Sequence, residues 1–263
     1  MEQNHLTLGM TAPDFTENST FGPISMSNYK GKWVIFFSHP GDFTPVCTTE
    51  FVAFSQAAPE FHALNAQLLG LSIDSNPSHL AWVNDIQLLT GVTVPFPVIA
   101  DRTGRVAALY GMIAPDASTQ ETVRNVYFID PNQKIRAILV YPLTNGRNIE
   151  EILRLLTALQ TTDKHQVVTP ANWKPGMPVL VPAAKTYNDL MQRETDPNSL
   201  GLDCIDWFWC YKNLPNSTMP EVTSTSTYDR TNPAMNAIPA GTQITEPEMT
   251  KQNFDSRRNR FRR

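Results

Sequence analysis

The chain has 263 residues, a net charge of -4 and 41% hydrophobic residues, a length that fits one large domain or one domain with a smaller companion. Its three cysteines are too few for a disulfide scaffold, and an odd number leaves at least one thiol unpaired unless subunits are bridged, which favours a reducing compartment. The first residues show no secretory signal and the apolar runs are only strand-sized, so we expect a cytoplasmic protein that does not enter a membrane.

Strand and helix patterns alternate along the first two thirds of the chain. The patterns predict strands at residues 32–37, 67–73 and 96–100 and helices from about Thr44, at 77–89 and at 103–110. A hairpin of residues 124–129 and 134–141 follows, and an amphipathic helix at 148–161 closes the domain. Right-handed crossovers make the central strands parallel, so this order predicts an α/β sheet with helices on its faces and the hairpin as an antiparallel edge.

The last third of the chain has a different texture. Short pieces interrupted by prolines follow Val168, and an aromatic segment covers residues 203–211. This part is too small for a core of its own, so we expect it to pack on the first domain or on another subunit. The predicted domains are residues 1–168, 169–214 and 215–263.

The final segment is rich in Ser, Thr, Asn and Pro and is predicted to be disordered. From Asn216 onward it holds seven basic and five acidic residues, against 14 and 20 in the rest of the chain. Five of the last seven residues are arginine, a pattern that could contact nucleic acid or an anionic surface. A solvated end is the plainer interpretation, and we expect no nucleic-acid partner.

Cys47 lies at the predicted start of the helix that follows the first strand. Backbone N–H groups are unpaired there and the helix dipole is positive, which stabilises a thiolate. Phe51 comes one turn later, so the sulfur should face the core. A single cysteine near a helix start can also be an ordinary packed residue, and the position alone does not separate the two interpretations.

The segment that contains Cys47 carries a family motif. It reads Ser-His-Pro-Gly-Asp-Phe-Thr-Pro-Val-Cys-Thr-Thr-Glu, in which Pro40, Thr44 and Cys47 match the Pro-x-x-x-Thr-x-x-Cys pattern of the peroxiredoxins. The Pro-Val-Cys-Thr-Thr-Glu core resembles the peroxiredoxin-6-like, or 1-Cys-type, subfamily. The resemblance extends from about Leu6 to Lys212. It implies a thioredoxin-like fold with a small C-terminal dimerisation domain, and it implies nothing for the tail.

The resemblance also implies roles for residues of the Cys47 loop. Cys47 would be the peroxidatic nucleophile, which attacks the O–O bond of a peroxide and becomes a sulfenic acid. Thr44 would hydrogen-bond the peroxide, and Pro40 would shield the sulfur from water. His39 would either tune Cys47 or simply pack in the loop.

Two arginines outside the loop resemble family residues as well. Arg124 resembles the arginine that holds the thiolate and the developing negative charge, a role that suits an always charged guanidinium. Arg147 resembles the second arginine of the subfamily, and Glu50 would orient one or both. Without the motif, a surface strand arginine and a loop cation would be the simpler interpretations.

Cys204 and Cys210 are separated by five residues, wider than the spacing usual in zinc sites and without companion ligands, so we expect no metal there. The segment resembles the end of those relatives in which a resolving cysteine bridges to the nucleophile of a partner subunit. This implies Cys210 as the resolving residue and Cys204 as an auxiliary thiol. The alternative is that Cys204 and Cys210 are simply buried or pair with each other.

The expected function is a thiol peroxidase that reduces hydrogen peroxide and small organic hydroperoxides with electrons from a thioredoxin-like or small-molecule thiol. We expect no metal, haem or other cofactor and a homo-oligomer, either a dimer or a ring of dimers. Residues 29–33 offer no serine nucleophile of the kind some relatives use for lipase activity, so no phospholipase activity is expected. The alternative function is a redox-sensing holdase chaperone of the same fold.

Overall fold

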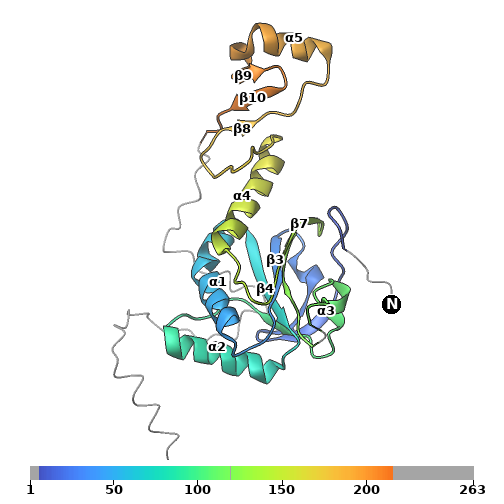
Figure 1. Cartoon of the computed structure of the whole chain (residues 1–263), viewed down its shortest axis with the longest axis vertical. Helices are drawn as coiled ribbons and strands as arrows, with labels where there is room; N and C mark the ends of the chain where they lie inside the picture. The colour runs from blue at the N-terminus through green and yellow to red at the C-terminus, as the bar shows by residue number, and fades with distance from the viewer. Residues whose placement is uncertain (1–5, 119, 216–263) are drawn as a thin grey trace, which may run out of the picture.

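The computed structural model describes residues 6–118 and 120–215. A seven-stranded sheet forms its centre, with the strand order β2-β1-β5-β4-β3-β6-β7 (Figure 1). Strands β3, β4 and β5 run parallel, and β6 pairs antiparallel with β3. The strands span β1 Thr16–Ser19, β2 Gly22–Ser25, β3 Trp33–Ser38, β4 Ala66–Ser72, β5 Val98–Ala100, β6 Arg124–Ile129 and β7 Ile135–Tyr141. This confirms the predicted α/β class, the parallel centre and the antiparallel hairpin at one edge.

The other edge of the sheet differs from the prediction. A hairpin of β1 and β2, which the sequence analysis did not identify, pairs antiparallel with β5 through Ser19 and Ile99. Each strand is only four residues long and follows no clear alternation of apolar side chains. Both edges of the sheet are therefore antiparallel, and the parallel strands lie in its middle.

The sheet is covered on both faces, because successive side chains of a strand point to opposite sides. Every residue of β3 is buried. Ile35 and Phe37 pack with helices α1, α2 and α4 on one face, whereas Val34 and Phe36 pack with α3 on the other. The helices span α1 Pro45–Ala63, α2 Asn76–Thr90, α3 Arg105–Leu109 and α4 Ile149–His165. A short loop therefore connects the end of β3 to the start of α1.

Helix α2 shows how local sequence sets an element boundary. The Ser75 hydroxyl accepts a hydrogen bond from the Ser78 backbone N–H at 3.3 Å, and Pro77 occupies the first turn, where its missing N–H costs nothing. Gly91 ends the helix with a φ of 75°, a left-handed conformation that favours glycine. The Ser75 side chain therefore caps the helix, and Asn76 is its first residue.

Replacing Ser75 with alanine is expected to lower the free energy of unfolding by about 1 kcal/mol, because the Ser78 N–H loses its partner. Urea unfolding of the reduced protein measures the change. Ser78→Ala is the matched control, since it removes a hydroxyl from the same turn and keeps the capped N–H. It is expected to change the free energy by less than about 0.5 kcal/mol. Equal losses in the two variants would contradict the capping role.

A small second unit follows α4. It contains helix α5 and a three-stranded sheet of order β8-β10-β9, with bounds α5 Tyr187–Thr195, β8 Val179–Leu180, β9 Asp203–Asp206 and β10 Trp209–Lys212. Figure 1 shows this unit beyond the far end of α4, away from the large sheet. Trp173 and Val179 pack with Ala158 of α4 in a small cluster of buried residues, so the unit is anchored on that helix. The boundaries at residues 168 and 214 stay predictions.

Two sequence-based expectations concern other parts of the chain. The predicted disorder of the tail falls on residues 216–263, which lie outside the described residues. Within the described ranges, no helix has both the length and the apolar character needed to span a bilayer.

Candidate active site

Cys47 lies in the first turn of α1 and is completely buried. Pro45 begins the helix, and Thr44 precedes it with extended backbone angles. The sulfur packs in the same buried cluster as Phe51, as the one-turn spacing predicted. Among the described residues, Cys47 is the one cysteine outside a disulfide. A buried thiol at a helix N-terminus is thus the centre of the site.

Arg124 reaches the sulfur of Cys47 from the neighbouring strand β6. Its Nη1 lies 3.3 Å from the Cys47 sulfur and also donates to the Glu50 carboxylate at 2.7 Å. Its other two nitrogens donate to the Leu143 carbonyl, so the whole guanidinium is held in place. A fixed, permanently charged donor beside the sulfur stabilises the thiolate and any negative charge that develops on a bound oxygen.

Arg147 holds the other side of the Glu50 carboxylate. Its Nε and Nη2 donate to the two carboxylate oxygens at 2.8 and 2.7 Å, and its Nη1 donates to the Ser38 carbonyl at 2.9 Å. The guanidinium also lies over the rings of Phe37 and Phe54, at 5.1 and 5.5 Å from their centroids. Glu50 therefore contacts both arginines that the sequence analysis singled out.

The Glu50 carboxylate is 2% exposed and carries its charge because of these arginines. Burial raises the pKa of Glu50, but the ion pairs and hydrogen bonds with Arg147, together with the charge of Arg124, outweigh burial and leave the pKa below its ordinary value. One buried negative charge thus stands between two buried positive charges. The excess positive charge faces the Cys47 sulfur.

The loop between β3 and α1 is tightly fixed. The Thr44 hydroxyl donates to the Gly41 carbonyl at 2.8 Å, and the Thr44 carbonyl accepts from the Thr48 N–H and hydroxyl. Pro40 is buried, and Phe43 adopts a left-handed φ of 56°, which is unusual for an aromatic residue. Pro40, Thr44 and Cys47 thus lie on one short, fixed segment that follows the end of β3.

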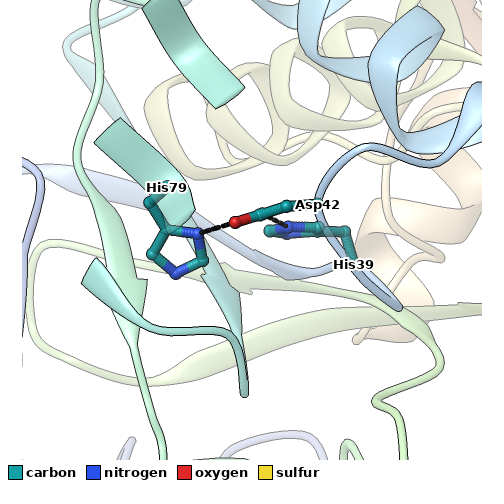
Figure 2. Close-up of side chains that lie close together, drawn as sticks. All are labelled: His39, Asp42 and His79. Carbon is teal, nitrogen blue, oxygen red and sulfur yellow. Dashed lines mark hydrogen bonds and ion pairs between the residues drawn. The ribbon is translucent and has the colours of Figure 1, made fainter. Parts of the chain in front are cut away.

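His39 lies in the same loop but belongs to a second cluster. Its Nε2 is 3.1 Å from the Asp42 carboxylate, and the same carboxylate contacts His79 of α2 at 2.8 Å (Figure 2). Asp42 and His79 are not among the predicted site residues, because nothing in the sequence pattern links a loop aspartate to a helix 37 residues away. These three side chains, with ligand atoms within 4.8 Å of one another, form the one group in the described chain that could hold a metal ion.

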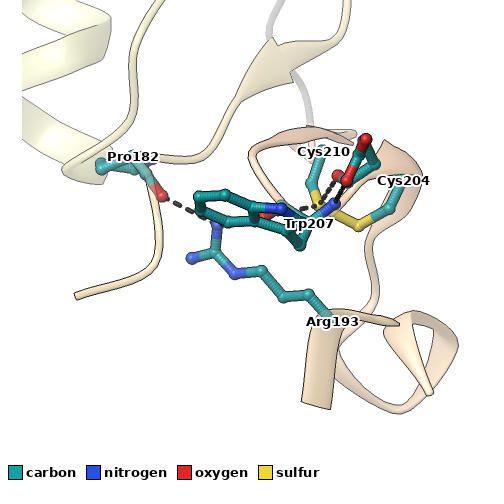
Figure 3. Close-up of a disulfide and its surroundings, with 6 residues drawn as sticks. Pro182, Arg193, Cys204, Trp207 and Cys210 are labelled. Carbon is teal, nitrogen blue, oxygen red and sulfur yellow. Dashed lines mark hydrogen bonds between the residues drawn. A yellow bond between two sulfur atoms is a disulfide. The ribbon is translucent and has the colours of Figure 1, made fainter. Parts of the chain in front are cut away.

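The remaining two cysteines lie in the hairpin of β9 and β10. Cys204 and Cys210 form a disulfide with each other (Figure 3), which is the alternative that the sequence analysis left open. The hairpin loop is tied down by Arg193 of α5, which donates to the Pro182 carbonyl at 3.0 Å and the Trp207 carbonyl at 3.4 Å. In the single chain, Phe208 of the hairpin loop is 53% exposed and Trp209 is 43% exposed.

Fold and site together define a class of protein. A buried cysteine at the N-terminus of the first long helix, with an arginine on its sulfur and a thioredoxin-like sheet behind it, is the arrangement of a cysteine-dependent oxidoreductase.

Comparison with known proteins narrows this class. Residues 8–138 match the model of the AhpC/TSA family, and residues 158–196 match the C-terminal domain of 1-Cys peroxiredoxin. The chain is 58% identical over 207 residues to Peroxiredoxin 2 of Caldanaerobacter subterraneus subsp. tengcongensis, covering 79% of this chain and 93% of that protein. It is 48% identical over 218 residues to a Peroxiredoxin of Aquifex aeolicus, covering 79% and 96%.

Solved structures agree with the sequence relatives. A yeast mitochondrial 1-Cys peroxiredoxin matches with a TM-score of 0.71 and 38% identity over 80% of this chain and all of that one. A cysteine-to-serine mutant of the Peroxiredoxin 6 of Arenicola marina matches with a TM-score of 0.72 and 35% identity, over 81% of this chain and all of that one. The chain belongs to the peroxiredoxin family. It is therefore an enzyme, a thiol peroxidase that acts on a peroxide and is returned to its starting state by a thiol.

Proposed function

We propose that Cys47 is the peroxidatic residue and reduces hydrogen peroxide and small organic hydroperoxides. The observation that carries this proposal is the 3.3 Å contact between Arg124 and the Cys47 sulfur. The thiolate attacks one peroxide oxygen, the O–O bond breaks, and Cys47 becomes a sulfenic acid while the second oxygen leaves as water or an alcohol. Arg124 stabilises the charge as it moves from sulfur to oxygen. Thr44 orients the peroxide, and Pro40 keeps water from the sulfur.

Arg147 and Glu50 serve this reaction indirectly. Both side chains are buried. Within the described part of the chain, Arg124 donates a hydrogen bond to the Cys47 sulfur, whereas Arg147 and Glu50 form none with it. Their ion pair fixes the carboxylate that in turn holds Arg124. We therefore assign both as positioning residues.

We propose further that Cys210 of the partner subunit resolves the sulfenic acid. Its thiol attacks Cys47, an intersubunit disulfide forms, and water leaves. Reduction by a thioredoxin-like protein or a small-molecule thiol then restores both thiols. The Cys204–Cys210 disulfide is the oxidised form of this pair and must be reduced before Cys210 can act, which makes Cys204 an auxiliary thiol.

The distance within one chain supports a resolving residue from another subunit. Arg147, next to the Cys47 site, lies two residues before α4, and this helix of 17 residues extends roughly 25 Å. Cys210 lies near the C-terminal end of this helix. The Val181 backbone N–H donates to the Cys210 carbonyl, and the neighbouring Leu180 pairs with Val168, which follows α4 closely in sequence. The two cysteines of one chain are thus separated by about the length of a helix. A homo-oligomer follows from this proposal, and the cytoplasmic location stays a prediction.

Hydrogen peroxide consumption by the reduced protein and by Cys47→Ser tests the first proposal. Rapid consumption by the wild type alone is the expected result. Consumption by neither protein, together with the ability to keep a thermally unfolding client soluble, would favour the holdase alternative.

Peroxide treatment followed by a non-reducing gel tests the second proposal. We expect covalent dimers in the pre-reduced wild type, their loss in Cys210→Ser, and most of them retained in the matched variant Cys204→Ser. The reverse pattern would show that Cys204, and not Cys210, is the resolving residue.

A further inference from the structure

The segment between β7 and α4 carries two of the contacts that fix the site. The Leu143 carbonyl accepts hydrogen bonds from Nε and Nη2 of Arg124 at 3.1 and 2.8 Å. Further along the segment, the Arg147 backbone N–H donates to the Glu50 carboxylate at 2.9 Å. Both ends of the stretch 143–147 are therefore held in place, and the backbone between them has a fixed distance to cover.

Asn145 and Gly146 lie between these two fixed points. Both residues are exposed, and they form the one Asn-Gly step of the whole sequence. An asparagine followed by glycine is the pair most prone to deamidation, because glycine has no Cβ to keep its backbone nitrogen away from the asparagine side chain. This reaction takes place within the chain and needs only water.

Two features of the structure favour the reaction at this position. The Thr144 hydroxyl donates to the side-chain carbonyl oxygen of Asn145 at 2.7 Å, which polarises the carbonyl and makes its carbon more open to attack. The Gly146 backbone N–H has no hydrogen-bond partner among the described residues, so the attacking nitrogen is not held elsewhere. An activated carbonyl is therefore followed in the chain by an unengaged nucleophile.

A second exposed asparagine provides the contrast. Asn198 precedes Ser199, whose backbone N–H donates to the Asp196 carboxylate at 3.3 Å at the start of the short helix Pro197–Leu200. That nitrogen is engaged, and Ser199 also carries a Cβ. Asn198 is therefore the internal reference for the loss of the Asn145 amide.

We propose that Asn145 is a site of spontaneous deamidation and that its isoaspartate product slows the reaction of Cys47. The Gly146 nitrogen bonds to the side-chain carbonyl carbon of Asn145, the bond from that carbon to the amide nitrogen breaks, and ammonia leaves with the glycine proton. Water then opens the succinimide ring. Opening at the side-chain carbonyl gives an aspartate, and opening at the backbone carbonyl gives an isoaspartate. No electrons are exchanged, so the reaction needs no oxidant or reductant.

The isoaspartate is the product with a structural consequence. Its main chain runs through the former side chain and is one methylene longer, between a carbonyl held by Arg124 and an N–H held by Glu50. The extra length shifts one of these contacts and with it the donor on the Cys47 sulfur. We expect Cys47 oxidation in such chains to slow by roughly 10- to 100-fold, the effect of a small displacement of a group at the reacting atoms.

The modification itself does not depend on the role of Cys47, whereas its effect on the rate rests on the proposed function. Ageing of the pre-reduced full chain at pH 8.5 and 37 °C tests the modification. Trypsin releases residues 137–147, in which Asn145 is the one asparagine, and residues 194–212, in which Asn198 is the one asparagine. Mass spectrometry should show replacement of NH₂ by OH in the first peptide while the second stays unchanged. An isoaspartyl methyltransferase, which methylates isoaspartate and not aspartate, should label the first peptide alone.

Three variants separate the steps. In Gly146→Ala the added Cβ hinders the attack, and its nearest neighbour, Val46, lies at an ordinary 3.5 Å, so the fold has room for it and the Asn145 amide should persist. Asn145→Gln, in which ring closure is slow, serves the same purpose if the alanine variant does not fold. Thr144→Val loses the hydroxyl bond, and ammonia release should slow about threefold, the net worth of one hydrogen bond.

Stopped-flow oxidation by hydrogen peroxide measures the consequence. Aged wild type should show a slow phase whose amplitude equals its isoaspartate content, and aged Gly146→Ala should match its own fresh sample. Fresh Asn145→Asp carries the added charge on a backbone of normal length. It should react within about threefold of the wild type, because an exposed charge is screened by water.

The outcomes keep this inference apart from the proposed function. A fresh wild type that consumes no peroxide refutes the role of Cys47, and the mass and methylation readings still decide whether Asn145 is modified. Equal amide loss at Asn145 and Asn198, equal loss in wild type and Gly146→Ala, or isoaspartate without a slow phase overturns the inference. An unchanged rate of ammonia release in Thr144→Val overturns the activation by its hydroxyl.

Discussion

Replacing Arg124 with methionine is expected to slow the oxidation of Cys47 by hydrogen peroxide by about 10²–10³-fold, the loss typical when a fixed donor to a developing anion is removed. Methionine keeps much of the side-chain volume but offers neither charge nor N–H. The Arg124 Nη1 that lies 3.3 Å from the sulfur also holds Glu50, so the variant loses both the thiolate partner and the ordered carboxylate. Stopped-flow measurement of the second-order rate constant with the pre-reduced protein tests the expectation.

Two further variants show what the guanidinium contributes. Arg124→Lys keeps a charge but not the planar set of donors, and it cannot contact the sulfur, Glu50 and the Leu143 carbonyl together. Its rate should fall between wild type and Arg124→Met. Arg105→Met removes an exposed arginine that pairs with Glu17, and it should react like the wild type. A rate within threefold of wild type for Arg124→Met would show that the contact is structural only.

The parts of the fold that were predictable from sequence are those with long or regular patterns. The continuous apolar run of β3, the amphipathic stripe of α4 and the hairpin of β6 and β7 each bury a face that the pattern itself reveals. The short strands β1 and β2 and the small sheet β8 to β10 lack such stripes. Their pairing depends on neighbours distant in sequence, such as Ser19 beside Ile99.

The site divides in the same way. Cys47, Thr44 and Pro40 lie in one continuous motif. Arg124 and Arg147 are far from this motif in sequence, and only the family resemblance identifies them as site residues. Asp42 and His79 needed coordinates, because a salt bridge across 37 residues leaves no local signal. For Cys204 and Cys210, spacing allowed several pairings. The bulged hairpin register that sets Cys204 opposite Cys210 decides among them.

Replacing Glu50 with glutamine is expected to lower the free energy of unfolding by about 3–5 kcal/mol, the range found when one partner of a buried ion pair is removed. Four N–H groups point at the two carboxylate oxygens, three from Arg147 and one from Arg124. Whichever way a glutamine amide turns, its NH₂ group faces two of these donors. Both guanidiniums stay buried, now without a counter-charge.

The pH dependence of this loss has a definite sign. The ordinary pKa of the glutamate is 4.5. In the folded protein burial raises the pKa of Glu50, but the ion pairs with Arg147 and Arg124 lower it by more, so the net pKa lies below 4.5. The stabilisation by Glu50 is therefore complete above pH 4.5 and is lost as the pH falls toward the lower folded value. The gap in unfolding free energy between wild type and Glu50→Gln should narrow steadily below pH 4.5.

Urea unfolding of both reduced proteins measures this gap at pH 7, 4.5 and 3.5. All samples are kept at one protein concentration, because subunit association adds to stability. Glu121→Gln, at an exposed loop position, is the control and should stay within about 0.5 kcal/mol of wild type at every pH. A gap that is constant between pH 7 and 3.5 would mean that the carboxylate acts through its shape and not through its charge. Arg124 of β6, Glu50 of α1 and Arg147 of the segment leading into α4 meet at the Glu50 carboxylate. A gap that narrows would therefore show that the negative charge of Glu50 holds together the elements that surround Cys47.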